Sequence, residues 1–367
     1  MSVLNRTLLL ITAVLLISYF TFDWIFPKDQ AKIIPLSYIN STGTVSSIKK
    51  KLEYYWYYPY WKHAEFAPSK IPSGYFNWIF HAFIWPDETW KLIIPEWFDA
   101  SKARTFLEKW KLVSISVGGW ENSEWFKVIA ENPESRKRFI NELKEFVERN
   151  WYNGVDLDWE YPVWAKQSDE FVLLANEIRR SMPWITLTAA LPISLSTLGI
   201  EKIFEIQKSL DFILVMAYDM EDWFDWYAWI NAPLYPNEKM PEDRSIATLL
   251  EVNYLNEWVP KEKIMLWLPL YGRKYNALSP YENTYWSDDI EYKNLPFDLC
   301  EKKSELWPVL ICGNSYISYD DMNSIEEKMR FAKDKWLKGV FFWALWQDDN
   351  KLIYKLRNKI NKPVKNR

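Results

Sequence analysis

Three carboxylates alternate with apolar residues in one short stretch of the chain, residues 155–160 (V-D-L-D-W-E). Side chains in an extended strand repeat with a period of two, so Asp156, Asp158 and Glu160 share one face, spaced about 6–7 Å apart. Like charges at that spacing repel, and poor solvation raises the pKa of at least one of them. Such a stack lowers stability, so we predict a functional site. An exposed edge strand with a solvated acidic face and a calcium site are the alternatives.

The elements around this stretch predict an α/β fold, a (β/α)8 TIM barrel. Eight short apolar runs are strand candidates: 53–61, 77–85, 111–119, 154–160, 185–192, 211–219, 263–272 and 339–346. Amphipathic helical patterns lie between them, as at 135–150, 168–181 and 324–335. A doubly wound open sheet would show a glycine-rich phosphate turn after its first strand, and Y-Y-P-Y-W is not one. The acidic stretch then ends the fourth strand, at the face where barrel enzymes bind substrate, with its carboxylates pointing inward.

Charge and composition exclude several classes of function. The net charge of −4 disfavours a nucleic-acid partner. His63 and His81 are the only histidines and there is no C-x-x-C, so a histidine or thiolate metal site is not expected. Nothing in the sequence calls for a metal or an organic cofactor. Cys300 and Cys312 are the only cysteines. In an oxidising compartment they could form a disulfide, and the alternative is two free thiols. The sequence does not decide between them.

The N-terminal segment predicts export. Residues 7–22 carry no charge and follow Arg6, and no small-x-small cleavage site comes after them. We expect residues 1–26 to be an uncleaved signal anchor, with a removed signal peptide as the alternative. Residues 27–51 form a tether, residues 52–362 the barrel domain and residues 363–367 a basic tail. The barrel is then anchored on the outer face of the cytoplasmic membrane, or secreted.

At this point a family resemblance can be stated. N-G-V-D-L-D-W-E-Y-P (153–162) resembles the D-x-x-D-x-D-x-E signature of glycoside hydrolase family 18, the chitinase family. Four further motifs that resemble those of the family follow in order: S-I-S-V-G-G-W (114–120) on strand three, M-A-Y-D (216–219) on strand six, L-P-L-Y-G-R (268–273) on strand seven and F-W-A-L (342–345) on strand eight. The resemblance covers residues 54–349.

The resemblance implies a retaining cleavage of β-1,4 bonds at N-acetylglucosamine units, in which the substrate's own acetamido oxygen is the nucleophile and an oxazolinium ion forms. Glu160 would be the general acid and base, its pKa raised by its carboxylate neighbours. Asp158 would bind the acetamide N–H, and Asp156 would lie beneath it and share its proton. Tyr218 would donate its hydroxyl to the acetamide.

The resemblance also implies substrate-binding residues. Asp219 and Arg273 would hold sugar hydroxyls, and Trp343 would form the apolar floor of the site. The predicted set is completed by Met216, Trp120 and Tyr161.

Each of these positions has a structural alternative. Tyr218 and Trp343 are core aromatics in that case, and Arg273 pairs with a surface carboxylate. For Gly118 and Gly119 we favour a structural role in closing the barrel. Whether Ser116 belongs to the site or only to barrel closure stays undecided.

Two departures from the family pattern stand out. Asn153 replaces the first acid of the signature, where we expect changed local hydrogen bonding and kept activity. The insertion after strand seven, residues 274–317, is shorter than the cap of long-cleft members, which implies a shallow groove.

Chitin oligosaccharides are the leading substrate, and peptidoglycan or the N-glycan core are alternatives. We expect a monomer whose partner is an N-acetylglucosamine glycan. A lectin that binds without cutting is the second hypothesis, which the presence of Glu160 disfavours.

Tryptophan is overrepresented and glycine underrepresented. The chain has 24 Trp and 9 Gly, whereas average usage predicts about 26 Gly. Some tryptophans follow helices, where a left-handed cap residue is expected: Trp110, Trp151, Trp258 and Trp336. Trp184 follows Pro183 at a position where a type II turn requires Gly. In the family, glycine is usual at 151, 267 and 346.

Two explanations are open. One is a carbohydrate-binding surface, to which Trp223, Trp226 and Trp229 would contribute. The other, which we favour, is a codon that the host decodes as glycine, as UGA is in some bacteria. Four tryptophans agree with the family and are taken as genuine: Trp61, Trp120, Trp159 and Trp343.

Overall fold

The computed structural model describes residues 52–71, 76–109, 111–194, 199–220, 227–284, 287–304, 307–348, 352 and 355. The predicted anchor (1–26), tether (27–51) and basic tail (363–367) lie outside these residues, as do Trp110, Trp223 and Trp226. Within the described part of the chain, no helix combines the length and the apolar character needed to cross a membrane.

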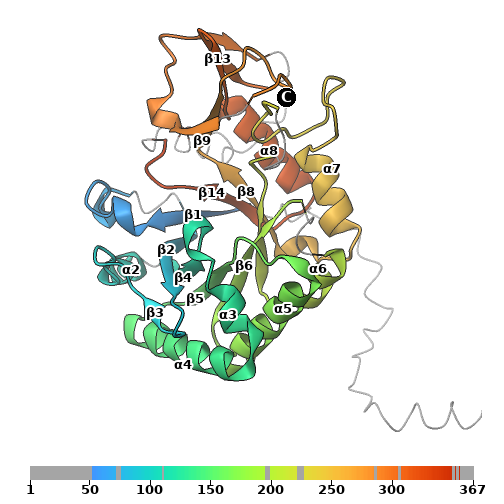
Figure 1. The fold of residues 1–367 in the computed structure, drawn as a ribbon. Coiled ribbons are helices and arrows are strands. Elements are labelled where there is room, and N and C mark those ends of the chain that lie inside the picture. The colour runs from blue at the N-terminus through green and yellow to red at the C-terminus, as the bar shows by residue number, and fades with distance from the viewer. Residues whose placement is uncertain are drawn as a thin grey trace, which may run out of the picture. The chain divides into compact units, whose positions relative to one another are not determined.

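A closed parallel barrel forms the body of the protein, as predicted (Figure 1). Its strands are β1 (Glu53–Pro59), β2 (Trp78–Pro86), β4 (Leu112–Gly118), β5 (Gly154–Asp158), β6 (Thr186–Pro192), β7 (Phe212–Met216), β8 (Ile264–Pro269) and β14 (Gly339–Trp343). They follow the order β1-β14-β8-β7-β6-β5-β4-β2, and the pairing of β1 with β2 closes the sheet. A short strand, β3 (Leu92–Ile93), pairs with β2 in antiparallel fashion. All eight apolar runs singled out in the sequence became barrel strands.

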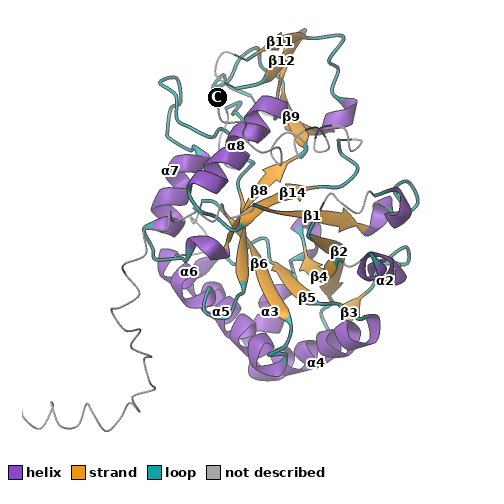
Figure 2. Cartoon of the chain, turned by 180° about the vertical axis from the view of Figure 1, so that it is seen from behind, coloured by secondary structure: helices purple, strands orange, loops and turns teal. Residues whose placement is uncertain are grey.

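Helices surround the barrel (Figure 2). They are α2 (Ser101–Glu108), α3 (Phe126–Glu131), α4 (Pro133–Asn150), α5 (Trp164–Ser181), α6 (Ile200–Ile206), α7 (Ile246–Leu250), which continues as a π-helical turn (Glu251–Leu255), and α8 (Met322–Asp334). Short 3-10 turns lie at Tyr60–Lys62, Pro68–Lys70, Trp120–Asn122, Lys261–Lys263 and Tyr292–Asn294. The residues at the start of α4 explain why the helix begins there. The Asn132 side chain accepts hydrogen bonds from the backbone N–H groups of Glu134 and Ser135, and Pro133 takes the first helical position.

An antiparallel sheet is inserted between β8 and α8. It consists of β9 (Tyr271–Tyr275), β10 (Ser287–Glu291), β11 (Glu301–Lys303), β12 (Val309–Cys312) and β13 (Ser315–Ser318), in the order β10-β9-β13-β12-β11. The sheet starts a few residues before the predicted boundary at 274, so Arg273 belongs to it. Cys300 and Cys312 form a disulfide with their Cα atoms 4.7 Å apart, which decides between the two alternatives left open by the sequence.

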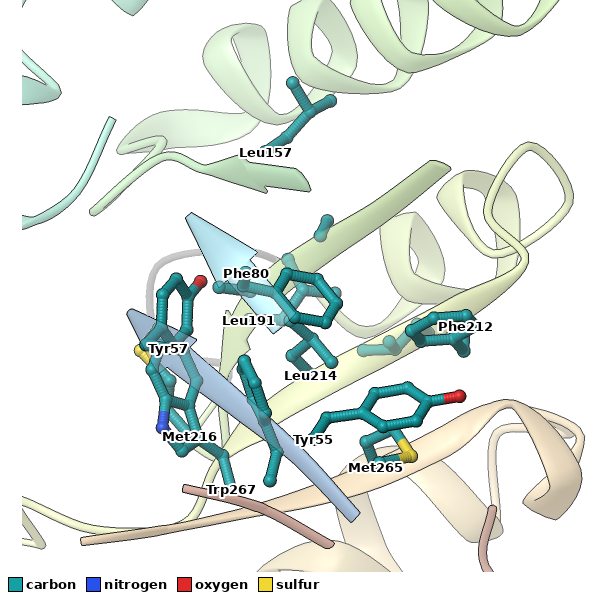
Figure 3. Packing of buried hydrophobic residues seen from close by; sticks show 14 of the residues in the cluster. Tyr55, Tyr57, Phe80, Leu157, Leu191, Phe212, Leu214, Met216, Met265 and Trp267 are labelled. Carbon is teal, nitrogen blue, oxygen red and sulfur yellow. The ribbon is translucent and has the colours of Figure 1, made fainter. Parts of the chain in front are cut away.

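Aromatic side chains fill the barrel interior (Figure 3). Tyr57 and Trp267 lie side by side there, stacked with ring centroids 4.7 Å apart, and Phe341 contacts both. All three side chains are almost completely buried. Burial of the Phe341 ring stabilises the fold by roughly 1.5–3 kcal/mol, so the packed interior contributes to the stability of the barrel that carries the acidic stretch.

The predicted cap conformation is confirmed at three helix ends and wrong at one turn. Trp151, Trp258 and Trp336 have φ of 65°, 61° and 64°. Trp184 does not have a positive φ. The Ile185 N–H bonds to the Met182 carbonyl at 3.2 Å, which closes a turn around Trp184. Because φ is negative there, this is not the predicted type II turn, and no glycine is required.

Candidate active site

The acidic stretch lies where the sequence places it, at the carboxyl end of β5. Val155 and Leu157 are fully buried on the face toward the helices, and Trp159 stacks on Phe126 of α3 at 5.4 Å. Asp156 and Asp158 are 0% and 1% exposed on the opposite face. The predicted division of the two faces is confirmed.

Asp156 is held by hydroxyl groups from three other strands. Tyr57 of β1 donates to Oδ2 at 2.6 Å, Ser116 of β4 donates to Oδ2 at 2.7 Å and Thr188 of β6 donates to Oδ1 at 2.7 Å. Burial raises the pKa of Asp156, and these hydrogen bonds oppose the rise. Ser116, undecided from the sequence, is therefore part of the site.

Sequence analysis missed Tyr57 and Thr188. The signal for Thr188 is strand register: Asp156 is paired with Ser116 on one side and Thr188 on the other, so polar residues at one level of adjacent apolar strands mark the site. Tyr57 reaches Asp156 across the barrel, and no local pattern indicates that contact.

Asp158 has fewer hydrogen bonds than Asp156. Its Oδ2 lies 3.3 Å from the Tyr57 hydroxyl, and its buried Oδ1 has no partner among the described residues. Burial, then the charges of Glu160 and Asp156, raises the pKa of Asp158 well above its usual range. Asp158 is therefore the member of the pair whose charge is less well stabilised by hydrogen bonds.

Glu160 follows directly after the strand. Its backbone N–H donates to Ser123 Oγ at 2.9 Å, and that hydroxyl also lies 3.0 Å from the carbonyl oxygens of Gly119 and Asp158. Ser123 thus links the carboxyl ends of β4 and β5 and holds the backbone N–H of Glu160 in place. Sequence analysis missed this residue.

The pKa of Glu160 is raised to about 7. Burial is the largest cause, the charge of Asp219 adds to it, and hydrogen bonding from Tyr161 opposes it. The raised pKa agrees with the prediction, but its predicted origin in the neighbouring carboxylates of the stretch needs correction. Desolvation dominates, and the carboxylate that contributes comes from the loop after β7.

Gly118 lies at the end of β4, where the close approach of the β5 backbone leaves no room for a side chain. Its φ is 111°, and an added Cβ would lie 2.2 Å from the Asp158 carbonyl oxygen. The neighbouring Gly119 donates its N–H to that same oxygen at 2.8 Å. Both glycines hold β4 against β5, which is the closure role that the sequence analysis favoured.

Asp219 and Arg273 meet beside the acidic stretch. The Tyr271 hydroxyl donates to Asp219 Oδ1 at 2.7 Å, and the Asp219 N–H donates to Asn231 Oδ1 at 3.0 Å. Arg273 lies 3.8 Å from Asp219 Oδ1 and pairs more closely, at 2.7 Å, with Asp289 of β10. The pairing of Arg273 with a surface carboxylate, the structural alternative, is thus present, and its contact with sugar hydroxyls stays a prediction. Tyr271 and Asn231 were missed by the sequence analysis.

Tyr218 lies between these carboxylates and the barrel core. Its ring is edge-on to Trp267 at 5.5 Å and to Tyr271 at 6.0 Å. Burial and the charges of Glu160, Asp219 and Asp158 raise the pKa of Tyr218 well above its usual range. Its hydroxyl therefore keeps its proton and can act as a donor near Glu160.

The remaining predicted residues also lie at carboxyl ends of strands. Met216 is buried at the end of β7. Trp343 ends β14, stacks on Phe83 at 5.8 Å and stays partly exposed. Trp120, half exposed after β4, meets Tyr161 edge-on at 6.3 Å. The carboxyl-end face thus gathers the predicted acids together with an apolar surface.

Asn153 lies before β5, at the other end of the strand from Glu160. Its Oδ1 accepts from the Val113 N–H at 3.0 Å, and its own N–H donates to the Val113 carbonyl at 2.8 Å. These bonds align β4 with β5 and do not involve the carboxylates of the site.

Comparisons with known proteins agree with this geometry. The profile of "Glycosyl hydrolases family 18" matches residues 53–348. The chain belongs to glycosyl hydrolase family 18. By this membership it is a glycosidase.

Curated relatives include a class V chitinase of Lotus japonicus, 28% identical over 82% of this chain and 83% of that protein. An endochitinase of Manduca sexta is 29% identical over 64% of this chain, which spans 50% of that longer protein. Among solved structures, a class V chitinase from Nicotiana tobaccum superposes with a TM-score of 0.76 at 22% identity, covering 85% of this chain and 99% of that one. The structural likeness supports the barrel fold.

Proposed function

We propose that this glycosidase cleaves β-1,4 bonds at N-acetylglucosamine units of chitin or chitooligosaccharides with retention of configuration. The observation that carries the proposal is the pair formed by Glu160, with a pKa of about 7, and Asp158, with a pKa raised well above its usual range. An acid with a pKa near neutrality can both give and take a proton at working pH. The chitinases among its relatives support the choice of substrate.

In the first step Glu160 transfers its proton to the bridging oxygen, and the bond from that oxygen to the anomeric carbon breaks. The acetamido oxygen of the same sugar forms a bond to the anomeric carbon, which gives an oxazolinium ion. Asp158 orients the acetamide and stabilises its positive charge, a role supported by its buried Oδ1, which has no partner among the described residues. The Tyr218 hydroxyl donates to the acetamide oxygen.

In the second step Glu160, now a carboxylate, takes a proton from water. The water oxygen bonds to the anomeric carbon on the face that the leaving group occupied, the acetamide is restored, and Glu160 is again protonated. Asp156 stays beneath and shares the proton of Asp158. Trp343 supplies the apolar floor under the ring, and Asp219 with Arg273 binds sugar hydroxyls.

Hydrolysis of a fluorogenic chitobioside tests the proposal. Glu160→Gln is expected to lower kcat about 10²- to 10⁴-fold, the usual contribution of general acid–base catalysis. Glu124→Gln is the matched control, because Glu124 is an exposed residue after β4. A folded wild-type chain that binds chitooligosaccharides and never releases the fluorophore would establish the lectin alternative.

Two further measurements define the reaction. The β-anomer must appear first in the products, and an initial α-anomer contradicts the substrate-assisted route. Peptidoglycan fragments and N-glycan cores, assayed beside defined chitooligosaccharides, test the alternative substrates.

We also propose that the protein is exported and acts as a monomer. The Cys300–Cys312 bridge supports an oxidising compartment, and the uncharged segment 7–22 supports an anchor or leader. Fractionation of source cells tests the location, and light scattering of the purified protein tests the mass.

A further inference from the structure

Tryptophan dominates the backbone positions that normally require glycine. Among the described residues, eight that are not glycine have a positive φ. Six of these are Trp90, Trp151, Trp164, Trp258, Trp336 and Trp346, and the others are Asp219 and Tyr281. Non-glycine residues with positive φ are uncommon, and Asn and Asp are the enriched types. A bulky aromatic residue has no steric reason to prefer this conformation.

Three of the six end helices in the same way. After Trp151, Trp258 and Trp336, the next N–H bonds to a carbonyl five residues back. These bonds are Tyr152 to Val147 at 3.2 Å, Val259 to Tyr254 at 3.3 Å and Leu337 to Ala332 at 2.9 Å. This is the Schellman pattern, whose left-handed residue is usually Gly and whose following residue makes the apolar contact.

The indole rings at these helix ends are largely exposed to solvent. Trp151, Trp258 and Trp336 are 65%, 83% and 59% exposed, whereas the three residues that follow them are buried. The side chain that anchors each helix end is therefore the next one along the chain. The backbone requires the left-handed conformation, whereas the apolar contact of each helix end comes from the residue after the tryptophan.

Two of the six lie in turns that specify glycine. In the β2–β3 hairpin the Trp90 N–H bonds to the Asp87 carbonyl at 3.1 Å, and the Asp87 N–H bonds to the Lys91 carbonyl at 2.8 Å. The residue in Trp90's place, with φ of 72°, is the left-handed residue that follows a turn in short hairpins. After β14, the Gln347 N–H bonds to the Ala344 carbonyl at 3.2 Å, and Trp346 has φ of 81°. This is the value at the third residue of a type II turn.

Buried indole nitrogens give a second, independent observation. The Nε1 atoms of Trp56, Trp90, Trp229 and Trp267 are buried and have no hydrogen-bond partner among the described residues. A buried Trp N–H normally has a partner, as in Trp78, which donates to Ser114 Oγ at 2.9 Å.

We propose that the protein made in its source cell carries glycine at positions 90, 151, 164, 258, 336 and 346. Its gene has at these positions a codon that the cell decodes as glycine, as UGA is in some bacteria. The deficit of glycine in the chain, 9 residues beside 24 Trp, has the same origin. The unpartnered indoles extend the assignment to positions 56, 229 and 267. None of this depends on the proposed function.

A sugar-binding surface does not account for the helix-end tryptophans. Trp151, Trp258 and Trp336 precede β5, β8 and β14, so they lie at the amino ends of barrel strands. Substrates bind to barrels of this kind at the opposite face, beyond the carboxyl ends of the strands. These exposed rings are therefore remote from Glu160.

The assignment changes the catalytic site at position 267. The Trp267 ring lies inside the barrel, 4.7 Å from the Tyr57 ring and 5.5 Å from the Tyr218 ring. Glycine there removes an indole from the space between the residue that holds Asp156 and the donor proposed for the acetamide. With glycine at position 267, the site beside Tyr218 is deeper than it is in the chain that carries Trp267.

Codons and native peptides test the assignment directly. We expect UGA at the six positions and UGG at Trp61, Trp120, Trp159 and Trp343. Mass spectrometry of peptides from the protein purified from source cells should give the mass of glycine at position 151. UGG at most of the six positions, or a native peptide with tryptophan at 151, overturns the proposal.

Thermal unfolding of recombinant chains provides a second test. Replacing Trp151, Trp258 and Trp336 together with Gly should raise Tm by roughly 5 °C, and replacing them with Ala should not, because alanine keeps the Cβ that disfavours positive φ. Trp97→Gly is the control: Trp97 is 74% exposed and does not have a positive φ, so no stabilisation is expected. A fall in Tm in the glycine variant overturns the proposal. If the tryptophan chain does not fold, recovery of folded protein in the glycine variant alone supports the proposal, and failure of both chains contradicts it.

Discussion

Tyr57 on β1 donates its hydroxyl to Asp156 on β5 across the barrel, with 2.6 Å between the two oxygens. The same hydroxyl lies 3.3 Å from Asp158 Oδ2. With Ser116 and Thr188, it gives Asp156 a full set of donors, while Asp158 has one long contact. Two adjacent carboxyl groups thus differ in how well their charge is stabilised. The hydrogen bonds therefore favour the charged form of Asp156 over that of Asp158.

The first prediction concerns the alkaline limb of the pH profile of kcat/KM. In the proposed mechanism Glu160 must be protonated to act as an acid, and its pKa is about 7, so activity is expected to fall above that pH. Asp219 raises the pKa of Glu160 and Tyr161 lowers it. Asp219→Asn should therefore move the limb to lower pH, and Tyr161→Phe should move it to higher pH.

The control for this pair is Asp288→Asn, an exposed carboxylate on β10, which is expected to leave the limb where it is. If the alkaline limb moved in the same direction in Asp219→Asn and Tyr161→Phe, Glu160 would not control the pH profile.

The second prediction concerns stability as a function of pH. The pKa of Glu160 in the folded chain is about 7, above the usual 4.5, so the folded state binds more protons than the unfolded state between these values. The free energy of unfolding then falls as pH rises through this window, by up to about 3 kcal/mol from this residue. Glu160→Gln should flatten the fall.

Urea unfolding at pH 4.5 and pH 7.5 measures the effect, and Glu124→Gln again serves as the matched control. Asp158 acts in the same direction, because its pKa is also raised, and so part of the fall remains in the Glu160 variant. An unchanged difference between the two pH values in Glu160→Gln would refute the assignment.

The third prediction concerns the support of Asp156. Thr188 donates to its Oδ1 at 2.7 Å, and both side chains are completely buried. Thr188→Val keeps the shape and removes the donor, so it should cost about 1.5–3 kcal/mol of unfolding free energy at neutral pH. Thr186→Val, at the start of the same strand, is the control and should cost much less. Equal losses in denaturant titrations would mean that the hydrogen bond to Asp156 is not the cause.

Local patterns in the sequence predict the barrel and the acidic face because both follow from side-chain periodicity. The eight apolar runs and the inward direction of Asp156 and Asp158 need no knowledge of distant contacts. The same holds for the helix ends at Trp151, Trp258 and Trp336, where helix and cap are neighbours in the chain.

What the sequence does not predict depends on the register of strands far apart in the chain. Tyr57 and Asp156 are 99 residues apart, and Asp219 reaches Glu160 from the loop after β7. The origin of the raised pKa of Glu160 was therefore assigned to the wrong neighbours. At Trp184 the pattern around Pro183 fits more than one turn type, so sequence could not distinguish them.

The last prediction concerns the disulfide of the inserted sheet. Cys300 precedes the exposed edge strand β11, and Cys312 ends β12, the strand that pairs with β11. Replacing both with Ser removes a cross-link over 12 residues, which in the chain-entropy model is worth about 3 kcal/mol at most.

The loss is expected to be local, because β12 is the one strand with which β11 pairs in the described part of the sheet. Hydrogen exchange should accelerate at residues 301–312 and stay unchanged in β5, and chitobioside hydrolysis should be kept. Treatment of the wild-type chain with a reductant should reproduce the pattern. Faster exchange at Val155 in both cases would show instead that the bridge stabilises the barrel as well as the inserted sheet.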